Sequence, residues 1–278
     1  MNKTKHTIPT FQNMKAAHRR IKMLTAYDYP TAAILDECDI DAILVGDSLG
    51  MVMLGYTSTL PVTIEDMIHH TRAVVRGAPH TLVVADMPFA SVTVSHERAI
   101  ENAARLIKEA GADAVKVEGG GPVCERVKGM VEAGIPVMGH LGLTPQSVGV
   151  LGGYKVQGKD ERSAMEVIEA AKALEQAGVF AIVLECIPAR LAEVVTSTVQ
   201  VPTIGIGAGP HCDGQVLVLH DLIGLTAGHV PKFVKRYADL RKDLAMAVSQ
   251  YAKEVDEGVF PDEVHSFGVS GEMTGRLY

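Results

Sequence analysis

The chain has 278 residues, of which 47% are hydrophobic and only 5% aromatic, a balance that suits helices packed on buried parallel strands. Its formal net charge of −7 argues against a nucleic-acid-binding protein, which would present a basic face. No stretch approaches the roughly 20 consecutive apolar residues of a membrane-spanning helix, so we expect no membrane partner.

The first 20 residues are basic and lack the apolar run of a secretion signal. A transit peptide would share this composition. Because the first apolar strand begins almost at once, at Ile21, we instead expect a short N-terminal helical cap over the floor of the fold.

Short apolar runs rich in Val and Ile then alternate with helical patterns along the chain. Runs of this kind are typical of strands buried in a parallel sheet. The predicted strands are Ile21–Ala26, Asp41–Gly46, Thr81–Asp86, Asp113–Glu118, Ile135–His140, Val179–Glu185, Pro202–Gly207 and Val216–His220.

The segments between these strands carry helix signals. Thr63 and Asp66 form a capping-box pattern, and Ser95 is a good N-cap for a helix that extends to about Ala110. A glycine suited to the left-handed position after a helix recurs just before three strands, at Gly111, Gly134 and Gly178.

About eight strand–helix units in strict alternation predict an α/β fold, a (β/α)8 TIM barrel that forms a single domain over residues 1–278. A last amphipathic helix is expected near Asp239–Val255, and residues 268–278 are expected to form a flexible tail. A doubly wound open sheet is the alternative, although no Gly-x-Gly-x-x-Gly turn follows the first strand.

The four cysteines form no Cys-x-x-Cys pair. In a chain of this length they are typical of reduced thiols, so we expect a cytoplasmic protein.

Titratable residues stand at the carboxyl ends of five predicted strands: Asp47, Asp86, Glu118, His140 and Glu185. In a barrel these ends converge on one mouth, where barrel enzymes have their active sites. One acidic residue after one strand is more often a helix cap or a turn residue, and a lone histidine is more often packed in a core. Five coincident positions favour a functional site.

The alternation within the strand Asp113–Glu118 sharpens this prediction. Lys116 and Glu118 share one face, whereas Val115 and Val117 share the other. The valines suit the helix-covered side, so Lys116 and Glu118 should point toward the barrel axis. Buried together, they would be costly unless they are paired or functional.

The carboxylates of Asp47, Asp86 and Glu118 are hard oxygen ligands, which suit Mg²⁺ better than zinc. The chain has no His-Glu-x-x-His motif and no cysteine cluster to support zinc.

Two loops could contribute to the same mouth. The long connection Leu141–Lys159 has the length of an active-site lid, with a surface excursion as the alternative. The glycine-rich segment Gly205–Gly209 follows the seventh strand, where barrels often bind phosphate, and it could equally be a tight turn.

Ten short stretches, taken together and in order, are highly specific. They are Thr25–Tyr29, Leu44–Gly50, Ser58–Thr63, Asp86–Phe89, Val115–Gly120, Gly139–Ser147, Gly152–Gly158, Leu184–Cys186, Ile204–Gly209 and Glu263–Phe267. Through them the chain resembles the ketopantoate hydroxymethyltransferase family from about Lys22 to Phe267.

The resemblance implies an Mg²⁺-dependent one-carbon transferase. Its co-substrate would be 5,10-methylenetetrahydrofolate, which donates a hydroxymethyl unit to 3-methyl-2-oxobutanoate. The product would be 2-dehydropantoate (ketopantoate), formed through a Mg²⁺-stabilised enolate in pantothenate and coenzyme A biosynthesis. The family also forms large cyclic homo-oligomers, commonly decamers.

The resemblance further implies a role for each polar residue at the mouth. The metal ligands would be Asp47, Asp86 and Glu118, the last through water. The substrate-binding residues would be Asp47, Ser48, Asp86, Lys116 and His140. The catalytic general base would be Glu185.

Two other functions stay open at this point. A related Mg²⁺-dependent barrel lyase would make or break a C–C bond in a 2-oxo acid with the same carboxylates but without folate. A non-catalytic barrel with a binding role would leave the five polar strand ends unexplained.

Overall fold

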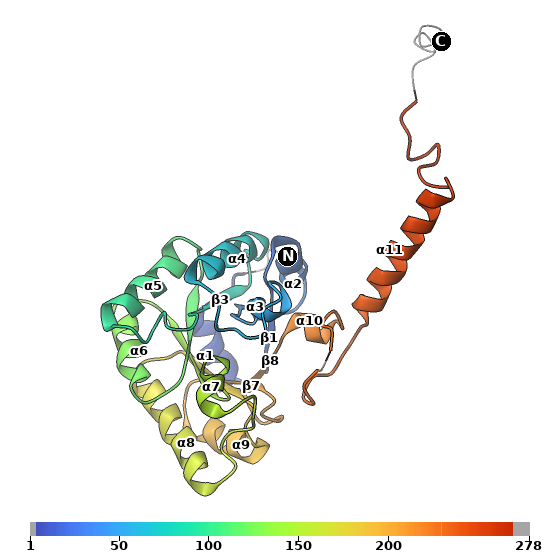
Figure 1. The fold of residues 1–278 in the computed structure, drawn as a ribbon. Coiled ribbons are helices and arrows are strands. Elements are labelled where there is room, and N and C mark those ends of the chain that lie inside the picture. Colours follow the sequence, from blue (N-terminus) through green and yellow to red (C-terminus); the bar gives the residue numbers. More distant parts are fainter. Residues whose placement is uncertain (1–3, 229, 269–278) are drawn as a thin grey trace.

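The computed structural model describes residues 4–228 and 230–268. Within these residues, eight strands form a closed barrel (Figure 1). Each strand is parallel to the next in chain order, and the first also pairs with the last. The strands are β1 (Ile21–Thr25), β2 (Ala42–Val45), β3 (Leu82–Asp86), β4 (Ala114–Glu118), β5 (Val137–Gly142), β6 (Ala181–Glu185), β7 (Thr203–Ile206) and β8 (Gly214–Leu217). The predicted (β/α)8 barrel is confirmed, and the open-sheet alternative is wrong.

Helices surround the barrel (Figure 1). The long ones in the connections are α2 (Tyr29–Glu37), α4 (Ile64–Gly77), α5 (His96–Lys108), α6 (Val123–Glu132), α8 (Glu161–Gln176) and α9 (Ala189–Thr198). Shorter helices lie in the loops: α3 (Leu49–Val52), the 3-10 turn η1 (Pro145–Ser147), α7 (Val148–Leu151) and α10 (Leu219–Leu222).

The helix signals in the sequence act as predicted. Thr63 and Asp66 form the reciprocal capping box of α4, and the Ser95 hydroxyl accepts the Arg98 N–H at the start of α5. The three glycines that end helices before a strand have φ angles of +81°, +83° and +94°, at Gly111, Gly134 and Gly178.

The eighth strand differs from the prediction Val216–His220. It begins at Gly214, and His220 lies in α10 instead. A Cβ atom on Gly214 would lie only 2.6 Å from the carbonyl oxygen of Ile21, so glycine allows β8 to approach β1 and close the barrel. This need arises from tertiary contact and is not visible in the apolar pattern of the strand.

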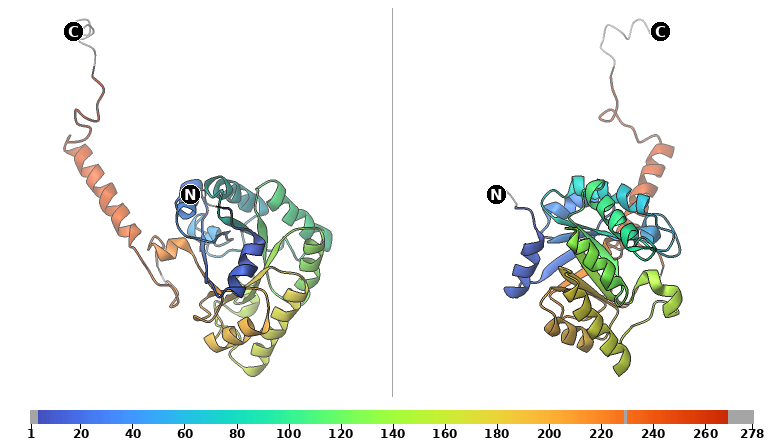
Figure 2. Two further views of the ribbon diagram at one scale, coloured as in Figure 1. Left: turned by 180° about the vertical axis from the view of Figure 1, so that it is seen from behind. Right: turned by 90° about the vertical axis from the view of Figure 1, so that its left-hand side faces the viewer.

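The barrel interior is filled by the inward-facing residues of the strands, including Met23, Leu44, Val84 and Met138. Helix α1 (Ile8–Ala16) lies against the barrel (Figure 2). Its Phe11 and Met14 side chains belong to the same cluster. The Phe11 ring packs edge-on against Phe180, with 5.8 Å between ring centroids. The predicted N-terminal cap is therefore confirmed as a plug at the amino end of the barrel.

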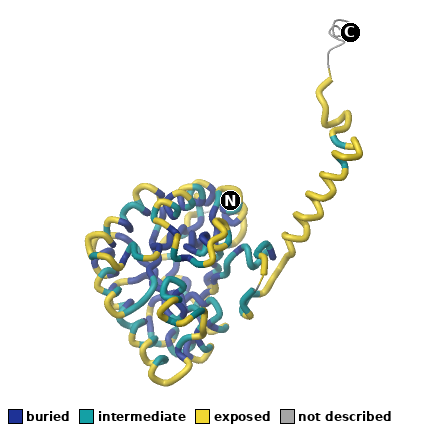
Figure 3. The backbone as a smooth tube through the Cα atoms, in the orientation of Figure 1, coloured by how far each residue is buried: buried dark blue, intermediate teal, exposed yellow. Residues whose placement is uncertain are grey.

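Helix α11 (Leu240–Asp256) extends away from the barrel (Figure 1), and it is exposed along almost its whole length (Figure 3). The predicted last helix is confirmed, but no residue of it is buried. Apart from Gly268, the predicted tail lies outside the described residues. No helix in the described part of the chain is long and apolar enough to cross a membrane.

Candidate active site

A cavity of about 710 Å³ opens at the carboxyl ends of the strands. Every site residue predicted from the sequence lines it: Asp47, Ser48, Asp86, Lys116, Glu118, His140 and Glu185. These residues come from the ends of five successive strands, β2 to β6, which converge because the barrel is closed.

The strand register brings opposite charges together at the mouth. Asp86 of β3 is aligned with Lys116 of β4, and Glu118 of β4 is aligned with His140 of β5. Val115 and Val117 pack in the outer hydrophobic cluster, under the helices. The prediction that Lys116 and Glu118 face the barrel axis is thus confirmed.

Lys116 is a buried ammonium group with several anionic neighbours. Its Nζ lies 2.7 Å from Asp86 Oδ1 and 3.1 Å from His140 Nδ1. Burial alone would lower the pKa of Lys116, but the charges of Asp86, Glu118 and Asp47 raise it above its ordinary value. Lys116 therefore keeps its charge and can bind an anionic ligand group.

His140 lies between two glutamates. Its Nδ1 is 3.4 Å from Glu118 Oε1, and its Nε2 is 3.2 Å from Glu185 Oε2. Burial and the charge of Lys116 lower the pKa of His140, but the hydrogen bonds to the two glutamates outweigh both and raise it to about 9. Lys116 can donate to Nδ1 only when that atom carries no proton. The raised pKa favours the imidazolium, which donates to both glutamates.

Asp47 and Asp86 form an acidic pair. The Asp47 N–H donates to Asp86 Oδ2 at 3.0 Å. Burial raises the pKa of both carboxyl groups, and the charges of Asp86 and Glu118 raise that of Asp47 further. The pKa of Glu118 is lowered instead, because His140 and Lys116 outweigh its burial. The aspartate pair is thus a place where added positive charge is favourable.

The donor chemistry of this pair fits Mg²⁺, which often takes one or two protein carboxylates and completes its shell with water or substrate oxygens. Within residues 4–228 and 230–268, no three Asp, Glu, His or Cys side chains are arranged to enclose a metal ion. Both carboxylate oxygens of Glu118 already have partners, since Oε1 lies 3.4 Å from His140 Nδ1 and Oε2 accepts the Gln146 N–H. The ligand set Asp47, Asp86 and Glu118 stays a prediction, with the two aspartates as its direct members.

Two polar residues at the site were not assigned a role from the sequence. The buried Tyr27 hydroxyl is 2.8 Å from the Ser48 hydroxyl oxygen, and Gln146 Nε2 donates to Asp47 Oδ2 at 2.9 Å. Both residues lie in stretches that carry the family resemblance. Nothing in strand alternation marks them, because each follows a strand and turns inward through the geometry of its loop.

The two candidate loops behave differently. Tyr154, Lys155 and Val156 of the long connection line the cavity, which supports its interpretation as a lid. A Cβ atom on Gly209 would lie 2.4 Å from the Ala189 Cβ, and one on Gly207 would lie 2.8 Å from the Phe233 ring. The glycine-rich segment is therefore better explained as a tight turn.

A parallel eight-stranded barrel with these side chains at its mouth is the architecture of a barrel enzyme. A putative phosphonomutase from Burkholderia cenocepacia J2315 has this fold, with a TM-score of 0.64 and 15% identity, covering 88% of this chain and 100% of its own. A 2,3-dimethylmalate lyase of the PEP mutase/isocitrate lyase superfamily has a TM-score of 0.61 and 15% identity, covering 98% and 91%. At such identities the likeness concerns the fold alone.

Sequence comparison is more specific. Residues 5–263 match the profile of ketopantoate hydroxymethyltransferase. The 3-methyl-2-oxobutanoate hydroxymethyltransferase of Clostridium acetobutylicum is 60% identical over 273 residues, which cover 98% of this chain and 99% of that protein. The chain belongs to the ketopantoate hydroxymethyltransferase family and is therefore an enzyme, which confirms the resemblance and excludes the non-catalytic alternative.

Proposed function

We propose that this chain transfers a hydroxymethyl unit from 5,10-methylenetetrahydrofolate to 3-methyl-2-oxobutanoate, giving ketopantoate for pantothenate and coenzyme A biosynthesis. The observation that carries the proposal is one cavity shared by an acidic pair, a buried ammonium and a separate glutamate. These groups belong to a chain that is 60% identical to an enzyme with that acceptor in its name. The reaction needs a cationic environment for the oxo acid and a base for its C3 proton.

Asp47 and Asp86 would hold Mg²⁺, with Glu118 beside it through water. When bound, Mg²⁺ would act as a Lewis acid that stabilises negative charge developing on the 2-oxo oxygen. Burial and the charges of Asp86 and Glu118 raise the pKa of Asp47. This supports the assignment, since a divalent cation would relieve the repulsion between these carboxylates.

Lys116 and Ser48 would hold the carboxylate of the oxo acid. Lys116 is 3% exposed and has carboxylates around it, so it keeps its charge although it is buried. The Tyr27 hydroxyl, at 2.8 Å, orients the Ser48 hydroxyl. His140, which contacts Lys116, would complete the substrate-binding set.

Glu185 would remove the C3 proton. Its side chain is 17% exposed, whereas that of Asp86 is 3% exposed, so Glu185 is the carboxylate that reaches into the open part of the cavity. The His140 ring at 3.2 Å holds it in place. The carbanion at C3 then attacks the methylene carbon, and water supplies the hydroxyl group. Both bonds from that carbon to the two folate nitrogens break. The nitrogens take up the proton removed from C3 and the remaining proton of the water, which releases tetrahydrofolate.

The size of the cavity supports a second substrate. At about 710 Å³ it is much larger than a branched five-carbon oxo acid requires. Sites for drug-sized ligands span roughly 300–1,000 Å³. Tyr154, Lys155 and Phe233 also line the cavity, and they offer aromatic and basic groups that suit the pterin and the carboxylates of a reduced folate.

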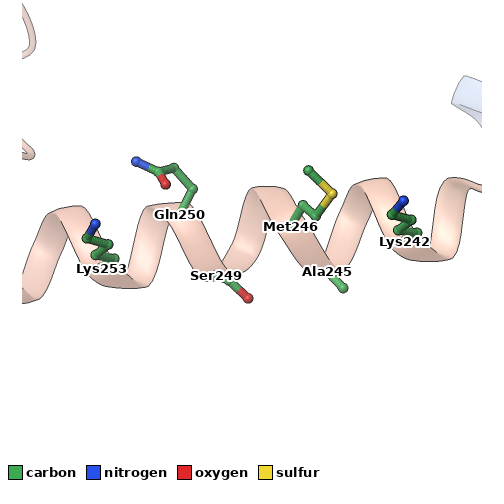
Figure 4. A pocket seen from close by; sticks show the side chains of 6 residues that line it. All are labelled: Lys242, Ala245, Met246, Ser249, Gln250 and Lys253. Atoms are coloured by element: carbon green, nitrogen blue, oxygen red, sulfur yellow. The ribbon is translucent and has the colours of Figure 1, made fainter.

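We also propose that the chain forms a cytoplasmic homo-oligomer, a decamer. Support comes from α11, whose Leu244, Met246 and Tyr251 side chains are 55–61% exposed. Figure 4 shows six side chains between Lys242 and Lys253 that project from α11 with no other element packed beside them. Light scattering should give ten chain masses, and a monomer mass would contradict the oligomer.

The cytoplasmic location is supported by the cysteines. Cys38, Cys124, Cys186 and Cys212 are free thiols, and reduced thiols are typical of cytoplasmic proteins.

Proton NMR of 3-methyl-2-oxobutanoate in D₂O tests the reaction directly. With enzyme and Mg²⁺, we expect the C3 proton signal to disappear as deuterium replaces it. On addition of 5,10-methylenetetrahydrofolate, hydroxymethyl resonances of ketopantoate should appear.

The outcomes separate the candidate reactions. Exchange without a folate-dependent product would indicate a lyase-type enzyme that forms the same carbanion. A folded, metal-loaded sample that shows neither exchange nor product would contradict the proposed function.

A further inference from the structure

Gln146 connects four strand ends of the barrel. It lies in η1, in the loop after β5. Its side-chain Nε2 donates to Asp47 Oδ2 after β2 and to the Met87 carbonyl oxygen after β3, both at 2.9 Å. Its backbone N–H donates to Glu118 Oε2 at the end of β4, at 3.0 Å.

The turn before Gln146 is fixed against β6. The Leu143 N–H donates to the Glu185 carbonyl oxygen at 2.9 Å. Gly142 has a φ angle of +95°, and a Cβ atom there would lie 2.2 Å from the same oxygen, so this close approach requires glycine. The position of Gln146 is therefore fixed by two sets of contacts: those of the preceding turn with β6, and its own hydrogen bonds to residues at the ends of β2, β3 and β4.

The amide is well suited to orient a metal-binding carboxylate. A glutamine side chain offers two N–H donors, and here they have two acceptors, one on Asp47 and one on Met87. The amide carries no charge, so it fixes the Asp47 carboxylate without competing electrostatically with a cation. Lys116 does compete in this way at Asp86.

We propose that Gln146 is a positioning residue that fixes the Asp47 carboxylate in the orientation used to bind the divalent cation. The inference rests on the proposed function, because it presumes that Asp47 is a metal ligand. The residue acts through Asp47 and has no chemical step of its own.

The variant Gln146→Met tests this role, since methionine has a similar length but no donor. The backbone N–H bond to Glu118 does not depend on the side chain and should persist. Mn²⁺ alone serves as the probe, and its free concentration is measured by electron paramagnetic resonance. We expect the Kd for Mn²⁺ to rise about 10- to 100-fold, the usual loss when a residue that orients a metal ligand is removed.

Two further readouts separate positioning from a general structural role. The apparent Mg²⁺ requirement of the transferase reaction should rise by the same factor, whereas kcat at saturating Mg²⁺ should change much less. The increase in Tm produced by a fixed Mn²⁺ concentration should shrink, because stabilisation by a ligand depends on its Kd. A purely structural role would lower Tm equally with and without Mn²⁺.

Gln157→Met is the matched control. Gln157 lies in the same loop, but its side-chain amide donates to the Lys155 carbonyl oxygen and not to a carboxylate. We expect wild-type Mn²⁺ binding from this variant, and an equal loss in both variants would overturn the proposal.

The remaining outcomes separate the role of Gln146 from the assignment of Asp47 as a metal ligand. A wild-type Kd for Gln146→Met, beside a wild-type enzyme that binds Mn²⁺ and forms ketopantoate, would refute the positioning role alone. Failure of the wild-type enzyme to bind Mn²⁺ would refute the metal assignment of the proposed function, and the role of Gln146 with it.

Discussion

The two ends of the barrel use acidic residues in opposite ways. At the floor, an aspartate stands directly before three strands: Asp41 before β2, Asp113 before β4 and Asp213 before β8. Each accepts the backbone N–H of a residue in the preceding strand and lies beside a basic side chain. At the mouth, Asp47 and Asp86 lie beside each other.

The difference lies in the partners and not in the residue type. The floor aspartates find backbone donors and cations within the chain, so they stabilise the fold. At the mouth, Asp86 also accepts a backbone N–H and pairs with Lys116, but it shares that ammonium with Asp47 and Glu118. Burial and these neighbouring negative charges raise the pKa of Asp47, and both aspartates face a cavity. In barrels, the end of the strand at which a carboxylate stands therefore distinguishes chemistry from stability.

If the mouth carboxylates serve chemistry and the floor carboxylates serve stability, a change at the mouth should remove activity and leave the stability of the fold intact. Glu185→Gln keeps the size of the side chain and removes the proposed base. We expect kcat to fall by about 10²- to 10⁴-fold, the usual contribution of a positioned base, with deuterium exchange at C3 reduced in parallel. Steady-state kinetics and NMR exchange would measure this, and a variant with full rate would contradict the role of Glu185.

The plug at the floor should show the reverse. Phe11→Ala removes a fully buried ring that packs against Phe180, so we expect a loss of about 3–5 kcal/mol in the free energy of unfolding. Urea unfolding measures this loss. At a temperature where the variant is folded, its KM for the oxo acid should equal that of the wild type. A large rise in KM would show that the floor and the mouth are coupled.

A floor aspartate provides the closest match to those at the mouth. Asp213 accepts the Thr203 N–H at 2.9 Å and lies 3.0 Å from Lys15 Nζ. In Asp213→Ala the buried N–H of Thr203 loses its acceptor, which should cost about 1–3 kcal/mol of stability. Mn²⁺ binding should be unaffected, and weakened binding would contradict the division between the two ends.

Much of this division could be predicted from the sequence. The period-two pattern of Val115, Lys116, Val117 and Glu118 was enough to assign inward and outward faces, because a strand has only two. The convergence of Asp47 and Glu185, far apart in the chain, follows from barrel closure once the strands are counted. Both steps depend on local periodicity and on a general property of the fold.

The parts that could not be predicted depend on tertiary contact. Gly214 begins β8 because the Ile21 backbone approaches it closely. Gln146 reaches Asp47 because the turn at Gly142 directs its loop across the mouth. The apolar residues of α11 were visible as a pattern, but the pattern did not show that the helix extends away from the barrel with no residue buried.

The smallest predicted effect concerns pH at the floor. Asp36 of α2 accepts hydrogen bonds from the His80 N–H and ring and from the Thr81 hydroxyl, and so anchors the start of β3. Burial opposes ionisation of Asp36, but these bonds outweigh it and hold the pKa of the carboxyl group below its ordinary value. Because the pKa of Asp36 is lower in the folded protein than in the unfolded chain, its charge stabilises the fold. This stabilisation is complete above the pKa in the unfolded chain, about 3.9, and is lost as the pH falls through the lower pKa of the folded protein.

Asp36→Asn should therefore be about 1–2 kcal/mol less stable than the wild type at pH 7, since hydrogen bonds to a charged group are stronger than those to a neutral amide. The gap between the two urea-unfolding curves should narrow below about pH 4, where the wild type itself loses the charge. A gap that stays constant from pH 7 to pH 3 would show that the Asp36 charge does not stabilise the floor. The distinction between the ends would then rest on packing and backbone hydrogen bonds rather than on ionisation.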